Sequence, residues 1–274
     1  MSVNEKMTAI ADAIRDKTGI AEKLTLDDMA LNISGVYDSG HINGYTDGYS
    51  DGKVLGIKTG KEEESRAWWD ALTSSASTAV FVYRFQYVDF EKVGGFHPPY
   101  VLKPQYAGYM FRGSTITKLT EKEVDVSNSA SGEYFIQGCE QLTEATGLDF
   151  RNARTLNYAF NTIPNIHTLE IVLGEKLSNT AQYVFWQMPK LENLTIGGVI
   201  TFTGATLQHS KLLTAESIES VVSALSDSAT GNKITFSTVA KTTYYNAHSS
   251  EYSDADTAWD ALCNTKPNWT ISLV

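Results

Sequence analysis

A tyrosine-led pattern that returns about every 25 residues is the feature that most constrains the fold of this chain. In Tyr158–Leu173 the pattern is a tyrosine, a phenylalanine two residues later, and apolar residues at steps 5, 8, 11 and 13. Its copies begin at tyrosines spaced 26, 25, 24 and 25 residues apart: Tyr83, Tyr109, Tyr134, Tyr158 and Tyr183. Such a period is typical of a solenoid, in which stacked coils bury an apolar face that no single coil could bury alone.

The register predicts a role for each part of a coil. We expect the Tyr-x-Phe segment to form a short helix or turn, and the L-x-x-L-x-I segment to form a half-buried strand. Stacked coils would then align aromatic rings on one side and Leu and Ile side chains on the other. Gly113 and Gly138 fall at the corner between the two segments, where glycine adopts a positive φ at the lowest cost.

Two of the copies, YFIQGCEQL at 134–142 and YAFNTIPNI at 158–166, resemble the AF-x-(G/N)-C-x-x-L unit of BspA-type leucine-rich repeats. The residues that fall on this motif are Phe111, Phe160, Phe185, Gly113, Gly138, Cys139, Leu142 and Leu191. Ile163 and Met188 stand at the place of the cysteine in two coils, which indicates that the cysteine fills the core and is not a ligand.

The order of segments along the whole chain is similar to minor tail or tail-fibre proteins of phages that infect Gram-positive gut bacteria. A short helical head and a glycine ladder precede the repeat, as described below. The resemblance implies a virion tail protein that binds the host surface, contacts other tail or baseplate proteins through its N-terminus, and forms a trimer.

Composition excludes several classes of partner. A net charge of −10 argues against nucleic acid and against anionic membrane surfaces. Two cysteines are too few for a disulfide scaffold. The first residues, MSVNEKMTAI, carry neither a basic leader nor an apolar signal segment, and no run is apolar enough to span a membrane. We therefore expect synthesis in the host cytoplasm and release by lysis as part of a virion.

Residues 1–36 are predicted to form two short helices that attach the chain to its assembly. Capping boxes start them at Ser2 and Thr25, and Gly19 and Gly35 end them. Fewer than forty residues cannot build a core, so their apolar stripes require another surface. A self-contained helical hairpin is the alternative.

Residues 37–79 carry glycine at every fourth position: Gly40, Gly44, Gly48, Gly52, Gly56 and Gly60. In a helix these glycines form a slowly drifting stripe. They would cost about 1 kcal/mol each relative to alanine, so close contact between helices along the stripe is the expected compensation. We predict a self-associating helix here, with a flexible Gly-rich linker as the alternative. The acidic TDGYSDG stretch lacks the ligand spacing of EF-hand and RTX calcium sites.

The predicted fold class is α+β, with the N-terminal helices followed by a leucine-rich-repeat solenoid over 80–213 and an α/β cap over 214–274. Thr214 should open a capping helix, because the open end of a solenoid exposes its core. KITFS at 233–237 and WTISLV at 269–274 should pair as strands, and 254–263 should form another helix.

No catalytic motif, metal-ligand spacing or cofactor fingerprint occurs in the sequence, so we predict that the protein is not an enzyme and needs no cofactor or metal. For binding, the outward positions of the repeat strands form columns of polar side chains suited to sugars, and one tryptophan lies nearby. The candidates are Glu144, Thr146, Thr168, Glu170, Trp186, Asn193 and Thr195. An ordinary solvated solenoid face is the alternative for all of them.

Together these features predict a phage tail-fibre or baseplate protein that displays an oligomeric repeat head to a bacterial surface glycan or protein. Two other functions fit the same repeat. One is a purely structural tail component whose head packs against other tail proteins, and the other is a cellular leucine-rich-repeat surface adhesin.

Overall fold

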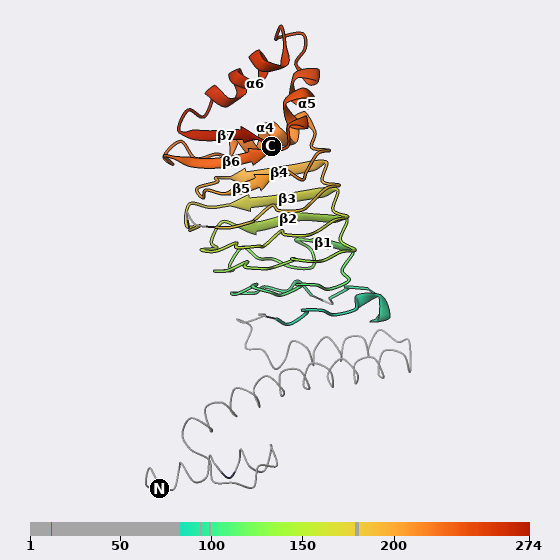
Figure 1. Cartoon of the computed structure of the whole chain (residues 1–274). Coiled ribbons are helices and arrows are strands. Elements are labelled where there is room, and N and C mark those ends of the chain that lie inside the picture. Colours follow the sequence, from blue (N-terminus) through green and yellow to red (C-terminus); the bar gives the residue numbers. More distant parts are fainter. Residues whose placement is uncertain (1–11, 13–82, 94, 99, 179–180) are drawn as a thin grey trace, which may run out of the picture. The chain divides into compact units, whose positions relative to one another are not determined.

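The computed structural model describes residues 12, 83–93, 95–98, 100–178 and 181–274 (Figure 1). The chain divides into two compact units, Met1–Trp68 and Trp69–Val274, and all described residues except Asp12 belong to the second. The predicted attachment region at 1–36 and the glycine-ladder helix at 37–79, with Gly40, Gly44, Gly48, Gly52, Gly56 and Gly60, lie outside the described residues apart from Asp12.

The repeat region is a parallel β-solenoid, as the tyrosine period predicts. Each coil from that of Tyr109 to that of Tyr183 contributes one strand to a sheet with the order β1-β2-β3-β4, and every neighbouring pair is parallel (Figure 1). The strands are β1 Lys118–Thr120, β2 Glu144–Phe150, β3 Thr168–Leu173 and β4 Asn193–Gly198. In the coil that begins at Tyr83, a short 3₁₀ helix, η1 (Phe90–Val93), precedes the first of these strands.

The tyrosine segments are turns, not helices, and their backbone alternates between two kinds of hydrogen bond. The tyrosine of each coil is counted as position 0. In the four coils from Tyr83 to Tyr158, the N–H groups at positions 0, 2 and 4 donate to carbonyls of the next coil. In the coil of Tyr109, the N–H groups of the intervening residues Met110 and Arg112 donate three residues back within the turn. This alternation requires a left-handed φ at positions 0 and 4, with values between 50° and 70° from the coil of Tyr83 to that of Tyr183. Glycine occupies position 4 in two coils, as predicted, and other residues adopt the same strained conformation elsewhere.

The core consists of side chains stacked in register through successive coils. Leu169 in β3 pairs with Leu194 in β4, and Ile171 pairs with Ile196. On the turn side, the ring of Phe160 is fully buried and stacks on Phe185 at 5.9 Å. The predicted apolar register is therefore confirmed for the described coils.

One coil departs from the pattern and compensates for it. Position 2 of the coil of Tyr134 is Ile136, where other coils have phenylalanine. Phe135 and Phe150 supply the missing aromatic volume, with ring centroids 5.3 Å apart. A β-bulge in β2 lies between Ala145 and Leu148 and lets Leu148 pair with Ile171.

A helix covers the edge of β4 and ends the sheet. Helix α4 (Ala215–Ser223) is capped by Thr214, as predicted. The N–H groups of Leu194 and Ile196 in β4 donate to the hydroxyls of Ser217 and Ser220, both at 2.8 Å. The exposed edge of a strand is a template for unwanted pairing, and α4 satisfies these edge donors without offering another strand.

Beyond this helix, a second parallel sheet and two helices complete the cap (Figure 1). The strands are β5 Ala205–Leu207, β6 Asn232–Phe236 and β7 Trp269–Leu273, in the order β5-β6-β7. The predicted pairing of β6 with β7 is confirmed, and so is helix α6 (Ala255–Asn264). Strand β5 and helix α5 (Val239–Ala247) were not expected from the sequence. None of the helices in the described part is long and apolar enough to cross a membrane.

Replacing Phe160 with alanine should lower the free energy of unfolding by about 3–5 kcal/mol, because it empties a buried position shared by adjacent coils. Chemical denaturation of the full chain measures this loss. Thr195→Ala, on the exposed side of β4, is the control and should stay within about 0.5 kcal/mol of the wild type. Equal stabilities for the two variants would contradict the register.

Both cysteines should stay unmodified by iodoacetamide in the native protein at pH 8. Burial raises the pKa of the Cys139 thiol to about 12, and that of the Cys263 thiol to about 11, so little reactive thiolate is present. Both are free in the structure, and Cys139 Sγ donates to the carbonyl of Phe111 at 3.0 Å. Mass spectrometry should find both thiols alkylated only after denaturation. A native disulfide between them would contradict this assignment.

Candidate ligand-binding groove

The sheet face brings six of the predicted binding residues together in two columns. In the first column, Glu144 pairs with Thr168 and Thr168 with Asn193. In the second, Glu170 pairs with Thr195, and Thr146 lies one coil away on β2, opposite Thr120. All six side chains are exposed or half-buried. This face is a nearly flat array of short polar groups, and Glu144 is already paired with Lys118 at 2.9 Å.

Trp186 does not belong to these columns. It lies at position 3 of a tyrosine turn, where its ring makes edge contacts with Tyr183 at 5.4 Å and His209 at 4.5 Å. The expectation that it would provide an aromatic face beside the polar columns therefore lacks geometric support. The aromatic surface of this molecule is on the turns.

Five tyrosine rings form a continuous ladder along the turns. Successive centroids from Tyr83 to Tyr183 are 4.6 to 5.3 Å apart, and the rings of Tyr134 and Tyr158 are within 5° of parallel. Burial raises the pKa of the Tyr109 and Tyr134 phenols, with the carboxylate of Glu133 acting in the same direction. Both hydroxyls therefore remain protonated at neutral pH and can donate hydrogen bonds.

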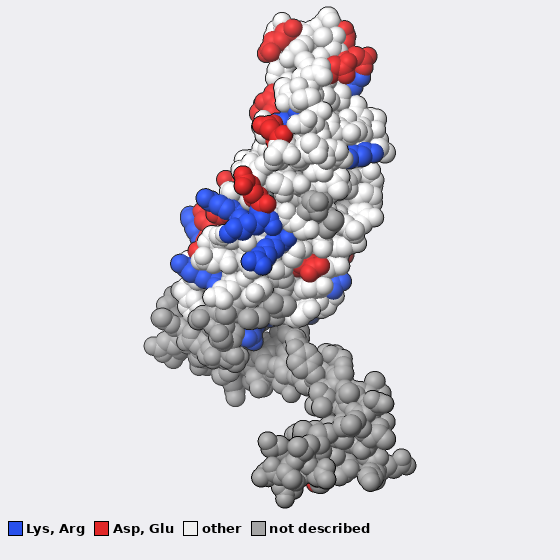
Figure 2. Space-filling model, turned by 90° about the vertical axis from the view of Figure 1, so that its left-hand side faces the viewer, with Lys and Arg blue, Asp and Glu red and all other residues white. Residues whose placement is uncertain are grey.

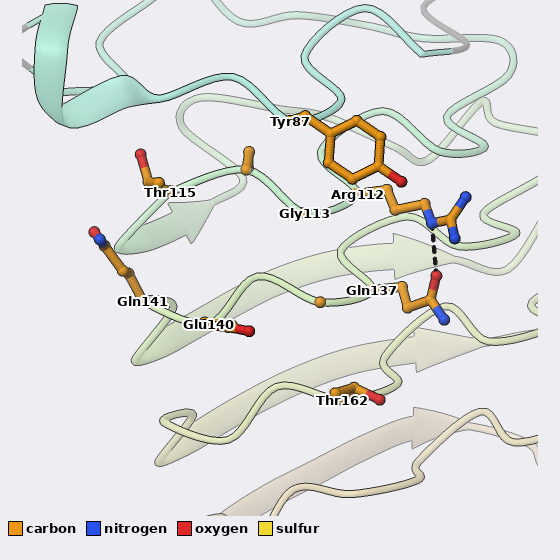
Figure 3. A pocket seen from close by; sticks show the side chains of 10 residues that line it. Tyr87, Arg112, Gly113, Thr115, Gln137, Glu140, Gln141 and Thr162 are labelled. Carbon is orange, nitrogen blue, oxygen red and sulfur yellow. Dashed lines mark hydrogen bonds between the residues drawn. The ribbon is translucent and has the colours of Figure 1, made fainter.

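Beside this ladder, two consecutive glycines open a groove of about 450 Å³ (Figure 3). Position 4 carries a side chain in the coils before and after: Tyr87 on one side and Thr162 on the other. Between them stand Gly113 and Gly138, so the stacked column loses its side chains for two coils. A volume of this size matches the pockets that hold small organic ligands.

Tyr87 forms one wall of the groove and packs directly on its glycine floor. A Cβ atom at Gly113 would lie 2.5 Å from two ring carbons of Tyr87, so the ring fills the space that a side chain would take. The Tyr87 side chain is nevertheless 60% exposed and presents an aromatic surface to the groove. At Gly138 the nearest atom to such a Cβ is 3.8 Å away, which leaves the floor open there.

Arg112 and Gln137, both at position 3, form a second wall (Figure 3). Arg112 Nε donates to Gln137 Oε1 at 2.7 Å. The guanidinium carbon lies 5.2 Å from the ring centroid of Tyr134, 5.6 Å from that of Tyr109 and 6.0 Å from that of Tyr87. These cation–π contacts and the hydrogen bond hold the arginine in one orientation.

The opposite wall carries polar side chains at the start of the strand segments (Figure 3). They are Ser114, Thr115, Glu140 and Gln141. The hydroxyl of Thr115 donates to Asp89 Oδ1 at 3.2 Å, which positions it. The groove thus combines one cation, one carboxylate, several neutral donors and acceptors, and an aromatic ring.

Several charged side chains elsewhere on the solenoid pair with one another or with neutral side chains. Figure 2 shows Lys and Arg side chains gathered beside Asp and Glu side chains on one side of the molecule. Near the ends of the strands, Arg151 makes two hydrogen bonds with Asp149, and Lys176 donates to Asn152 at 2.8 Å. Acidic side chains therefore lie beside basic ones on this part of the surface.

Within the described ranges, no three His, Cys, Asp or Glu side chains converge so as to hold a metal ion. Sequence reasoning singled out Gly113 and Gly138 as turn residues and missed the groove, Tyr87, Arg112 and Gln137. The signal was available in the repeat register, since glycine stands at position 4 in two adjacent coils only.

Comparison with known proteins found no matching family model, no matching curated protein and no matching solved structure.

Alanine at the two floor glycines should have unequal effects on stability. Both have a positive φ, 65° at Gly113 and 70° at Gly138, which costs alanine about 1–2 kcal/mol. Gly113→Ala must also displace the ring of Tyr87, so we expect its loss to exceed that of Gly138→Ala. Denaturant titration of both variants measures the difference. A larger loss for Gly138→Ala would contradict the packing of Tyr87 on the floor.

Proposed function

We propose that this chain is a phage tail protein whose solenoid head binds a glycan on the host surface, and that the groove is its binding site. The virion setting is supported by the likeness of the whole chain to phage minor tail and tail-fibre proteins. The motif at 134–142 and 158–166 supports an origin of the coils in BspA-type leucine-rich repeats. Glycan binding is supported by the chemistry of the groove.

The observation that carries the proposal is a polar groove walled by an exposed aromatic ring on a rigid frame. A sugar ring presents C–H groups that pack on an aromatic ring, and hydroxyls that need both donors and acceptors. Tyr87 offers the aromatic surface, and Gln137, Gln141 and Thr115 offer the polar groups. Because backbone hydrogen bonds between coils fix the turns, little ordering would be required when a ligand binds.

Oligomerisation would multiply the strength of a weak glycan site. We propose that the glycine ladder at 37–79 joins three chains, and that residues 1–36 attach them to other tail or baseplate proteins. Linked heads that engage neighbouring glycans at once would bind a cell surface far more tightly than one head. The wide, open groove on each solenoid suits repeated sugar units.

Two other functions remain as competing proposals. A structural tail component would use the solenoid to contact tail proteins and would bind no cells. A cellular surface adhesin would bind cells or glycans and would occur on bacteria rather than on virions. Labelling purified virions with an antibody against this chain separates the adhesin from the tail protein.

Filling the groove with a side chain should strongly weaken binding of the protein to host bacteria. In Gly138→Gln, the introduced side chain matches the one at position 4 of a later coil, Gln187, so the turn tolerates it while the groove is blocked. We expect the full wild-type chain to bind intact cells of the host in a pull-down or by flow cytometry. Gly138→Gln should lose about tenfold or more in affinity, as for a ligand deprived of its main polar contacts.

Two matched variants serve as controls. Gln187→Gly removes a side chain from the same column outside the groove and should bind as the wild type does. Glu170→Ala with Thr195→Ala removes two of the three side chains of the second polar column of the sheet and should also leave binding intact. Loss of binding in the sheet variant alone would move the site to the sheet face. No binding by the wild type to any strain that the virion infects would favour the structural component.

A further inference from the structure

We infer that the groove recognises a carboxylate-bearing sugar and that Arg112 binds its carboxylate. This inference rests on the proposed glycan-binding function and names the class of glycan. It starts from the state of the Arg112 guanidinium, which is held firmly but has no acidic partner.

The terminal nitrogens of Arg112 have no hydrogen-bond acceptor among the described residues. The Nε atom is occupied by Gln137 Oε1, and three tyrosine rings surround the guanidinium carbon. No carboxylate of the described part lies within ion-pair distance of it. The fork formed by Nη1 and Nη2 is therefore fixed in place at the groove and available to a ligand.

Acidic residues outnumber basic ones in this chain by 32 to 22. Four cations of the solenoid have an acidic partner: Lys92 pairs with Asp89, Lys103 with Asp125, Lys118 with Glu144 and Arg151 with Asp149. Arg112 differs from these four, because tyrosine rings and the amide of Gln137 hold it in place of a carboxylate. A stacked guanidinium with a free fork is the arrangement that binds a carboxylate with two parallel hydrogen bonds.

The other side chains of the groove favour an acidic sugar over other anionic ligands, such as a peptide carboxylate or a phosphate ester. Glu140, Gln141 and Thr162 line it and can accept from or donate to several hydroxyls. Tyr87 provides an apolar ring surface for the C–H groups of a pyranose. A peptide carboxylate would present few hydroxyls to these groups. A phosphate monoester carries a charge of about −1.5 to −2, so Glu140 would repel it more strongly than it repels the single charge of a sugar carboxylate.

The test compares one oligosaccharide in two forms. Full-length protein is titrated with an oligogalacturonate and with the same oligosaccharide after reduction of its carboxyl groups to primary alcohols, by calorimetry at low salt. We expect the reduced form to bind about tenfold or more weakly, because it loses hydrogen bonds to a charged group. Glucose 6-phosphate and an acetylated acidic peptide serve as the other anionic probes and should bind more weakly than the oligogalacturonate.

Variants of Arg112 assign the effect to this residue. Arg112→Gln should weaken binding of the acidic sugar about as much as reduction does, and should weaken binding of the reduced sugar much less. Arg112→Lys keeps the charge but loses the fork, so its affinity should fall between those of the wild type and Arg112→Gln. Near-ultraviolet circular dichroism, which reports on the tyrosine ladder, confirms that the variants are folded.

The outcomes separate this inference from the proposed function. If reduced and acidic sugars bind equally, and Gly138→Gln abolishes both, the groove is a glycan site and the role of Arg112 is wrong. Tighter binding of the phosphate or the peptide would also overturn the inference. If the protein binds host cells and Gly138→Gln does not weaken that binding, the groove itself is not the site. If it binds neither cells nor any sugar, the proposed function fails.

Discussion

The hydrogen bonds between successive coils set the one spacing on which the rest of this structure depends. Strands in a sheet lie about 4.8 Å apart, and the tyrosine turns are tied to one another in the same way. The tyrosine centroids follow this spacing, at 4.6 to 5.3 Å. Aromatic rings stack well at this separation, so the backbone ladder and the ring ladder reinforce each other.

A fixed spacing also means that the surface is shaped by differences between coils. Where a column carries a polar side chain in successive coils, as with Thr168 and Asn193 on the sheet, those side chains lie next to one another. Where the column loses its side chains, as at Gly113 and Gly138, a groove opens because the backbone cannot close the gap. The same rigidity holds Arg112 against Tyr109 of its own coil and against Tyr87 and Tyr134 of the two neighbouring coils. A binding site on such a frame is organised before the ligand arrives.

At β4, the last strand of the first sheet, the regular stacking of strands stops. Another strand beside β4 would have extended the ladder, and an open edge would have invited pairing with other chains. Helix α4 lies where the next strand would pair with β4. The hydroxyls of Ser217 and Ser220 accept the hydrogen bonds that the carbonyls of such a strand would have accepted. The second sheet starts with β5, which precedes α4 in the chain, and continues after α4 with β6 and β7.

The sequence by itself determined the solenoid, the register of its core and much of its cap. The same positions are buried in every coil, so apolar residues recur in the sequence at the length of one coil. It identified the inward position of Phe160, the helix capped by Thr214 and the pairing of β6 with β7. Short or weakly patterned elements such as β5 and α5 were decided by packing, since their own residues carry too little signal. Only the tertiary structure decided the groove. Its walls come from Tyr87, Arg112 and Gln137 in three different coils, and which outward side chains become neighbours depends on how those coils stack.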